Sequence, residues 1–558
     1  MEKIWLKSYP EGVPAEIDIN EYQSLAQLFD EAAAKFGSRK AFTCMGKSIT
    51  FAELDQQSAA FGAWLQSNGL KKGDRVALMM PNVLQYPVGL FGVLRAGGTV
   101  VNVNPLYTPR ELEHQLKDSG AETIVVIENF AHVLQEVIAS TPIKRVVVTS
   151  IGEMLGLKGV LVNFVIRHVK KLVPPYALPN PITFSKAIAD GRAKKLVKPT
   201  LTHDDIAFQQ YTGGTTGVAK GAMLLHRNIV ANLLQSRAWL QPFLKTDSQQ
   251  IIITALPLYH IFSLTANCLV FITLGANNVL IPNPRDMKGF VEELKKHKFT
   301  AFTGVNTLFN GLLNTPGFDQ IDFKPLQMTL GGGAAVQKAV AERWKQVTGI
   351  TLIEAYGLTE TSPGATINPL NLKEFNGSIG LPIPSTELML RDDGGNEVGI
   401  GPPGEICIRG PQVMKGYWNK PEETAQVIDK DGWLATGDVG VVDDQGFFRI
   451  VDRKKDMILV SGFNVYPNEI EAVVAMMPGV LENAVIGVAD DKTGEAVKVI
   501  IVKKDPNLSE ADVMAHCRIH LTGYKVPRHV AFRTELPKTN VGKILRRELR
   551  EMEKKLAA

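Results

Sequence analysis

Helix-like and strand-like segments alternate through the first part of this chain, and the alternation limits the folds open to it. Three segments with helical apolar spacing and three short β-branched runs follow one another at residues 53–66, 75–80, 83–96, 99–103, 109–119 and 123–127. Strands that alternate with helices form parallel sheets whose crossover connections are helical. The sequence therefore predicts an α/β fold, with a large N-terminal body of two wound sheets.

The pattern of predicted secondary structure changes after about residue 379. Short alternating runs at 387–391 and 404–409 are broken by Asp-Asp-Gly-Gly and Gly-Pro-Pro-Gly, which favours antiparallel strands in a small β subdomain. The tail then has its own α+β pattern, with helices expected at 467–476 and 509–521 and strands at 481–488 and 496–503. We place a boundary near Lys455, between an N-terminal domain of residues 1–454 and a small mobile lid domain of residues 455–558.

Composition excludes several classes of protein. The 558 residues suffice for roughly three or four domain-sized units. The net charge of +4 is close to neutral for this length, so a dedicated nucleic-acid binder is disfavoured. The cysteines are far apart and form no CxxC pair, which argues against zinc or disulfides and fits a reducing cytoplasm; they are Cys44, Cys268, Cys407 and Cys517.

Two segments bear on membrane contact. Residues 251–281 contain no charged side chain, but Pro257, His260 and Asn267 interrupt the run, so buried core is favoured over a spanning helix or a transporter. The N-terminus has no apolar stretch typical of a secretory signal, and a cytoplasmic location is expected.

The second segment, residues 157–173, reads as a helix in a stretch without acidic residues. One side gathers Asn163, Arg167, Lys170 and Lys171, while apolar residues fill much of the rest. Such a helix can lie in the interface of an anionic bilayer, at the inner face of the cytoplasmic membrane. It can equally be a surface helix packed on its own domain, and both alternatives stay open.

A glycine- and threonine-rich turn at residues 211–221 is the strongest local motif. Glycine lets the backbone approach an anion closely, amides and hydroxyls donate hydrogen bonds, and Lys220 adds positive charge. The motif is not a Walker A loop, because Gly221 and Ala222 follow the lysine where Ser or Thr is required. It predicts a phosphate-binding loop; the alternative is a flexible surface turn.

Four further residues are candidates for chemistry. Tyr356 offers a stacking face beside the glycine run 331–333, and Glu360 is suited to hold Mg²⁺ beside phosphates. Asp438 is suited to accept the hydroxyls of a ribose, and Lys543 could neutralise charge that develops in a reaction. Taken singly, each feature has a structural alternative. The glycine run is more often a turn, and an acid such as Glu360 after a threonine more often belongs to the first turn of a helix. The segment of Asp438 is more often a hairpin, and a C-terminal lysine is more often solvated.

These motifs occur together and in order, and in that combination the chain resembles the adenylate-forming (AMP-dependent) acyl-CoA synthetases. The resemblance spans residues 27–547 and is carried by residues 211–221, 256–260, 331–335, 356–360, 404–417, 431–438, 452–467 and 537–547. Residues 431–471 are similar to the fatty-acyl-CoA synthetase signature, and residues 162–171 resemble the bacterial long-chain members.

The resemblance implies a nucleotide site. ATP phosphates would contact Thr212, Gly213, Gly214, Thr215, Thr216, Gly217, Lys220 and Thr359. Adenine and ribose would contact Gly331, Gly332, Gly333, Ala334, Tyr356, Gly357, Asp438 and Arg453. Mg²⁺ would bind Thr215 and Glu360.

It also implies roles in the reaction. Lys543 would be the catalytic lysine of acyl-AMP formation, assisted by Thr215 and Glu360, and His260 would border the acyl carboxylate. Lys455 would be the hinge, and the pantetheine arm of coenzyme A would pass Ser461, Gly462 and Phe463 after rotation of the small domain.

The implied activity is ATP-dependent conversion of a long-chain fatty acid to acyl-CoA through acyl-AMP, with release of AMP and pyrophosphate. The alternatives are a medium-chain or aryl acid:CoA ligase, a ligase that loads a carrier protein, and a catalytically silent nucleotide-binding protein. A homodimer is compatible with the sequence.

Overall fold

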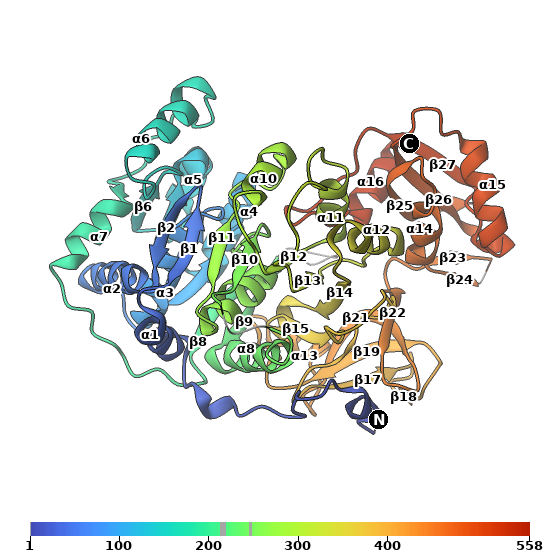
Figure 1. Cartoon of the computed structure of the whole chain (residues 1–558), viewed down its shortest axis with the longest axis horizontal. Helices are drawn as coiled ribbons and strands as arrows, with labels where there is room; N and C mark the ends of the chain where they lie inside the picture. The colour runs from blue at the N-terminus through green and yellow to red at the C-terminus, as the bar shows by residue number, and fades with distance from the viewer. Residues whose placement is uncertain (1, 213–218, 245–247, 462, 491, 558) are drawn as a thin grey trace.

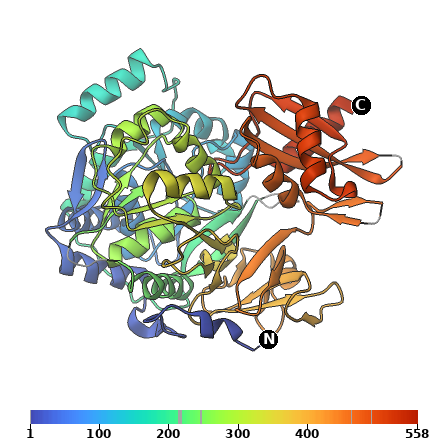
Figure 2. The ribbon, with the colours of Figure 1, turned by 45° about the vertical axis from the view of Figure 1, so that its right-hand side comes forward.

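The structure is a computed structural model that describes residues 2–557 except 213–218, 245–247, 462 and 491. A large body carries a smaller C-terminal unit at one end, and the two meet along one side of the body (Figures 1 and 2). The predicted α/β class, with two wound sheets, a small β subdomain and an α+β unit, is confirmed.

The first sheet has eight strands, parallel from β8 to β7. Its order is β20 (Gly416–Tyr417), β9 (Lys220–Leu225), β8 (Ile206–Thr212), β4 (Thr99–Asn102), β3 (Arg75–Met79), β5 (Thr123–Ile127), β6 (Arg145–Thr149) and β7 (Ile182–Thr183).

The second sheet has nine strands and is parallel in its centre, from β14 to β1. Its order is β16 (Leu381–Pro382), β15 (Gly364–Ile367), β14 (Leu352–Gly357), β13 (Met328–Gly331), β12 (Ala301–Gly304), β10 (Ile251–Thr254), β11 (Asn277–Leu280), β1 (Lys40–Cys44) and β2 (Lys47–Thr50). One apolar core is shared by both sheets and by several helices of the body.

Two five-stranded sheets complete the fold. The β subdomain contains β18 (Glu397–Val398), β17 (Glu387–Arg391), β19 (Gly404–Arg409), β21 (Leu434–Val442) and β22 (Phe448–Arg453). The C-terminal unit contains β24 (Phe463–Val465), β23 (Ile458–Val460), β26 (Gly494–Lys503) and β25 (Val480–Asp490), with β27 (His529–Arg533) paired to β26.

The helices of the body follow the local signals in the sequence. The helix expected at 109–119 begins and ends where predicted, because Thr108 and Glu111 form a capping box and Gly120 adopts a left-handed C-cap. The body helices are α1 (Leu25–Phe36), α2 (Phe51–Ser67), α3 (Gln85–Arg95), α4 (Pro109–Ser119), α5 (Ala131–Val137), α6 (Leu157–Phe164), α7 (Phe184–Arg192), α8 (His226–Leu240), α9 (Val270–Thr273), α10 (Met287–Leu294), α11 (Asn306–Leu313), α12 (Lys338–Thr348) and α13 (Pro421–Val427).

The C-terminal unit has its own apolar core and three helices. Side chains from β23, β25 and β26 pack with those of two helices in a core separate from that of the body. The helices are α14 (Pro467–Ala475), α15 (Glu510–His520) and α16 (Arg546–Ala557).

Residues 157–173 differ from the single helix that the sequence predicts. Helix α6 continues into a π-helical turn, Val165–Val169, and projects from the body (Figure 1). Its polar side faces the body: Arg167 pairs with Glu128 at 2.7 Å, and Asn163 donates to the Ser150 hydroxyl at 2.9 Å. The helix thus packs on its own domain through polar contacts, while its apolar side is exposed; the exposed residues are Leu157, Val160, Leu161, Phe164, Val169 and Leu172.

The uncharged run 251–281 forms β10, a π-helical segment (Ser263–Leu269), α9 and β11, and is largely buried. Across the described ranges of the chain, helices that combine the length and apolar character needed to cross a bilayer are absent.

Candidate active site

The glycine run and the motif around Tyr356 meet at one edge of the nine-stranded sheet. Gly331 ends β13 and pairs in parallel with Glu354 of β14, so the carboxyl ends of both strands lie at the same edge of the sheet. Gly333 and Ala334 are exposed there, and Gly333 has a φ of +77°, which favours glycine. The edge is thus an open shelf of backbone against which a flat ring can lie.

Gly357 is required by a close approach of two strands. A Cβ at this position would lie 1.9 Å from the carbonyl oxygen of Pro363, at the antiparallel junction of β14 and β15. Because glycine has no side chain, the two strands can approach here. The 3₁₀ turn Thr359–Thr361, which carries Glu360, follows directly.

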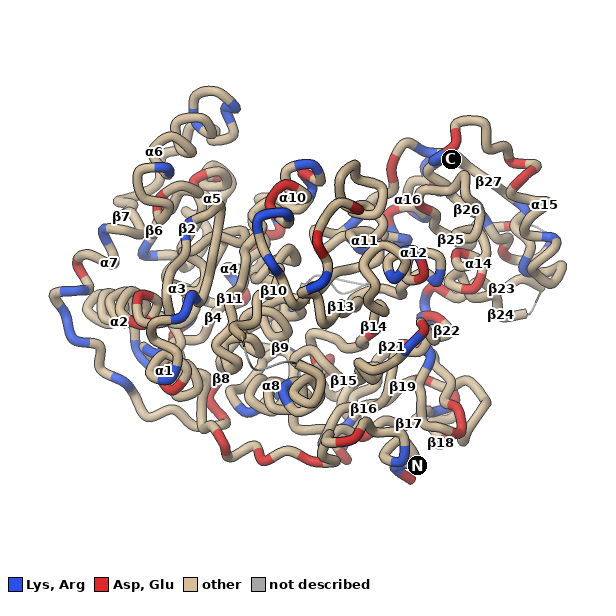
Figure 3. The backbone as a smooth tube through the Cα atoms, in the orientation of Figure 1, with Lys and Arg blue, Asp and Glu red and all other residues tan. Residues whose placement is uncertain are grey.

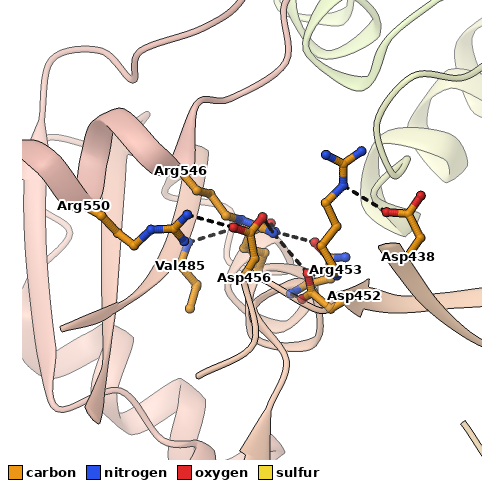
Figure 4. A network of polar contacts seen from close by, with 9 residues as sticks. Asp438, Asp452, Arg453, Asp456, Val485, Arg546 and Arg550 are labelled. Carbon is orange, nitrogen blue, oxygen red and sulfur yellow. Dashed lines mark hydrogen bonds and ion pairs between the residues drawn. The ribbon is translucent and has the colours of Figure 1, made fainter. Parts of the chain in front are cut away.

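Asp438 is held from two sides beside this shelf. The Tyr356 hydroxyl donates to its carboxylate at 2.7 Å. The Arg453 guanidinium pairs with the same carboxylate at 3.0 Å, as Figure 4 shows. The carboxylate is almost fully buried, which strengthens these contacts. Tyr356 therefore orients the residue predicted to hold ribose.

Glu360 lies in a second cluster, beside strand β9. The Tyr417 hydroxyl donates to the Glu360 carboxylate at 2.7 Å, and the Lys220 ammonium lies 4.4 Å from the centre of the Tyr417 ring. Thr212 of β8 and Lys220 of β9 face each other in the antiparallel pair of strands. A carboxylate suits Mg²⁺, which in nucleotide sites takes few protein ligands and several phosphate oxygens.

Lys543 reaches this site from the C-terminal unit. A Cβ on Gly333 would lie 3.2 Å from its Cε and 3.8 Å from its Nζ, and the Thr307 hydroxyl of α11 donates to the Gly542 carbonyl at 2.9 Å. Burial and then the Arg453 charge lower the pKa of Lys543 to about 8, while Asp438 and Glu360 act in the opposite direction. The lysine, both carboxylates and the glycine shelf therefore share one site.

His260 borders the same site as an uncharged ring. Burial, followed by the positive charge of Lys543, lowers the pKa of His260 to about 3. At neutral pH it can accept or donate one hydrogen bond but adds no positive charge toward a carboxylate.

The lowered pKa of Lys543 predicts a pH dependence. The ammonium is present below about pH 8 and is lost as the pH rises through that value, so kcat/KM for acyl-AMP formation should fall there, since this ratio reports the free enzyme. Lys543→Arg keeps its charge and should lose this falling limb. Pyrophosphate exchange measured from pH 6 to 10 checks this, and identical profiles would contradict it.

Other predicted residues lie apart from this cluster or outside the described ranges. Ser461 and Phe463 are exposed on the β23–β24 hairpin, where Phe463 stacks on Tyr524, at the edge of the C-terminal unit (Figures 1 and 2). Lys455 is exposed in the connection between β22 and β23. The predictions that fall outside the described residues concern Gly213, Gly214, Thr215, Thr216, Gly217 and Gly462.

The sequence interpretation assigned no role to three residues that organise the site. Tyr417 positions Glu360, and Asp452 and Arg546 form an ion pair at the base of the C-terminal unit. All three lie inside motifs that carried the resemblance, so the signal was present. Their partners are 57 and 94 residues away, and spacing does not show such pairings.

Comparison with known proteins agrees with this geometry. Residues 29–418 match the family described as AMP-binding enzyme, and residues 469–543 match the AMP-binding enzyme C-terminal domain. The chain is 59% identical to a long-chain-fatty-acid–CoA ligase of Yersinia pestis, over 100% of this chain and 99% of that protein.

Solved structures show the same fold. The anthranilate CoA ligase AuaEII in complex with anthranoyl-AMP has a TM-score of 0.86 at 26% identity, covering 97% of this chain and 100% of that one. ATP-bound MatB from Rhodopseudomonas palustris has a TM-score of 0.80 at 28% identity, covering 96% and 100%, whereas apo MatB has 0.71. The chain belongs to the AMP-binding enzyme family, the adenylate-forming acyl-CoA synthetases.

Proposed function

We propose that this protein converts a long-chain fatty acid to acyl-CoA in two steps, first forming acyl-AMP and pyrophosphate from ATP, then transferring the acyl group to the thiol of coenzyme A. The observation that carries the proposal is the placement of Lys543 against Gly333, between the Asp438 and Glu360 clusters. The 59% identity to a ligase named for long-chain fatty acids supports the substrate class.

The first step must bring a carboxylate to the α-phosphorus of ATP, an anion to a polyanion. The Lys543 ammonium lowers this repulsion and stabilises charge that develops on the transferred phosphoryl group. Lys220 and the loop amides hold the β- and γ-phosphates, Thr359 contacts the α-phosphate, and Asp438 with Arg453 holds ribose. Mg²⁺, when bound at Glu360 and Thr215, neutralises phosphate charge.

The second step needs different groups at the same carbonyl carbon. We propose that residues 455–558 rotate about Lys455 relative to residues 1–454, withdrawing Lys543 and bringing the 461–463 hairpin to the site. The exposed position of Ser461 and Phe463 in the present arrangement supports such a second state. The higher TM-score against ATP-bound than apo MatB supports the present one as the adenylate-forming state.

The test is pyrophosphate release across acids from acetate to oleate, with and without coenzyme A. We expect the highest kcat/KM for long-chain acids and sustained turnover only with coenzyme A. Preference for benzoate or octanoate, or turnover with a carrier protein in place of coenzyme A, would favour the alternative ligases.

We also propose that the exposed side of α6 contacts an anionic bilayer, at the inner face of the cytoplasmic membrane. The apolar residues point away from the body, and residues 154–189 contain basic but no acidic side chains (Figure 3). Lys170 and Lys171, at the end of the helical segment, are exposed, and basic residues together with exposed apolar residues are a combination typical of interfacial helices.

Vesicle sedimentation checks the membrane proposal. The double variant Leu161→Asp, Phe164→Asp should reduce binding to phosphatidylglycerol vesicles by at least about tenfold, since it removes two apolar side chains that would enter the bilayer and adds negative charge. Ile519→Asp, at an even more exposed apolar site on α15, should leave binding unchanged. Equal binding by both variants would contradict the assignment.

A further inference from the structure

A buried ion-pair network lies where the C-terminal unit joins the body (Figure 4). Its centre is Arg546, the first residue of α16, three residues after Lys543. The guanidinium contacts Asp452 at 3.3 Å, Asp456 at 3.5 Å and Glu471 at 2.8 Å. Arg550, one turn later, contacts Asp456 at 2.9 Å.

The acids of this network lie on different sides of Lys455. Asp456 and Glu471 follow it, so they move with Arg546 in any rotation about that residue. Asp452 precedes it, in β22, and stays with the body. The Asp452–Arg546 pair therefore spans the proposed hinge, whereas the pairs to Asp456 and Glu471 do not.

Asp452 is also the most completely buried member. Its side chain has no exposed surface, and its oxygens accept from the Arg453 and Asn468 amides at 2.7 and 2.9 Å. The Arg453 amide thus ties it to the residue that pairs with Asp438 in the nucleotide site. A buried carboxylate has little stabilisation beyond such partners, so separating it from Arg546 is costly.

We propose that the Asp452–Arg546 pair is a positioning clamp that favours the arrangement with Lys543 in the site, and that it must open before thioester formation. The inference rests on the proposed two-step function. Loss of the clamp should lower the population with Lys543 inserted, and so slow acyl-AMP formation without slowing transfer to coenzyme A.

The matched variants are Asp452→Asn and Asp456→Asn. Each removes one negative charge that contacts Arg546, and the two aspartates lie on opposite sides of Lys455 in the chain. We expect Asp452→Asn to lower the single-turnover rate of acyl-AMP formation about tenfold, with thioester formation from supplied acyl-AMP equal or faster. Asp456→Asn should change both rates to the same extent, because Asp456 and its partners Arg546 and Arg550 move together and keep their contacts in both arrangements. Equal losses in the two half-reactions for Asp452→Asn would overturn the proposal.

A distance measurement tests the proposed clamp independently of the reaction rates. Spin labels at Lys338→Cys on α12 and Ile519→Cys on α15 report the arrangement of the two units, since the four native cysteines are buried. Asp452→Asn should broaden the ATP-bound distance distribution, and Arg546→Lys should do the same if the first variant fails to fold. An unchanged distribution would overturn the clamp alone, whereas absence of acyl-AMP from the unmodified protein would overturn the two-step function and the clamp together.

Discussion

Replacing Lys543 with alanine should lower the rate of acyl-AMP formation by at least about a hundredfold, the effect of removing one preorganised charged donor. The reason is local: the ammonium lies against Gly333, in the field of Asp438 and Glu360. Transfer of the acyl group from supplied acyl-AMP to coenzyme A should keep its rate. Rapid-quench measurement of each half-reaction checks this.

Lys538→Ala is the matched control for this variant. Lys538 lies in the same loop but pairs with Glu482 of the C-terminal unit at 2.6 Å, so its loss should change either rate only a few-fold. Equal losses in both half-reactions for Lys543→Ala would show that the residue supports the structure and not the first step.

Replacing Glu360 with glutamine should also reduce acyl-AMP formation by at least about a hundredfold and raise the Mg²⁺ concentration needed for half-maximal rate. The amide keeps the shape and can still accept from the Tyr417 hydroxyl, so the substitution removes charge and little else. Titration of pyrophosphate release with Mg²⁺ measures both effects.

Glu354→Gln is the control in the same motif. Burial raises the pKa of Glu354 to about 8, so this carboxyl is largely protonated at pH 7, and the neutral amide should change the rate by less than about threefold. If Glu354→Gln matched Glu360→Gln, the loss would reflect damage to the motif and not the charge of Glu360.

Elements with local signals were predictable from the sequence. Helix α4 has its cap, its Pro109 start and its glycine end within thirteen residues, and its predicted bounds are those observed. The glycine shelf and the Glu360 turn were found as motifs, because each is one short segment. Their meeting at one sheet edge followed from the resemblance and is explained by the parallel pairing of β13 and β14.

Orientation and long-range pairing were not predictable. The polar side of α6 turns inward because Arg167 meets Glu128, a residue 39 positions earlier in the chain. An amphipathic pattern has the same period whichever side faces the body, so the sequence left the direction open. The Asp452–Arg546 pair likewise depends on how two units with separate apolar cores pack together.

The most direct test of the account is a single turnover of α-labelled ATP with excess enzyme, oleate and Mg²⁺ in the absence of coenzyme A. The account predicts that label passes into acyl-AMP with one equivalent of pyrophosphate, and that adding coenzyme A then converts this intermediate to oleoyl-CoA and AMP. Formation of ADP and phosphate, or no labelled intermediate until coenzyme A is added, would contradict it.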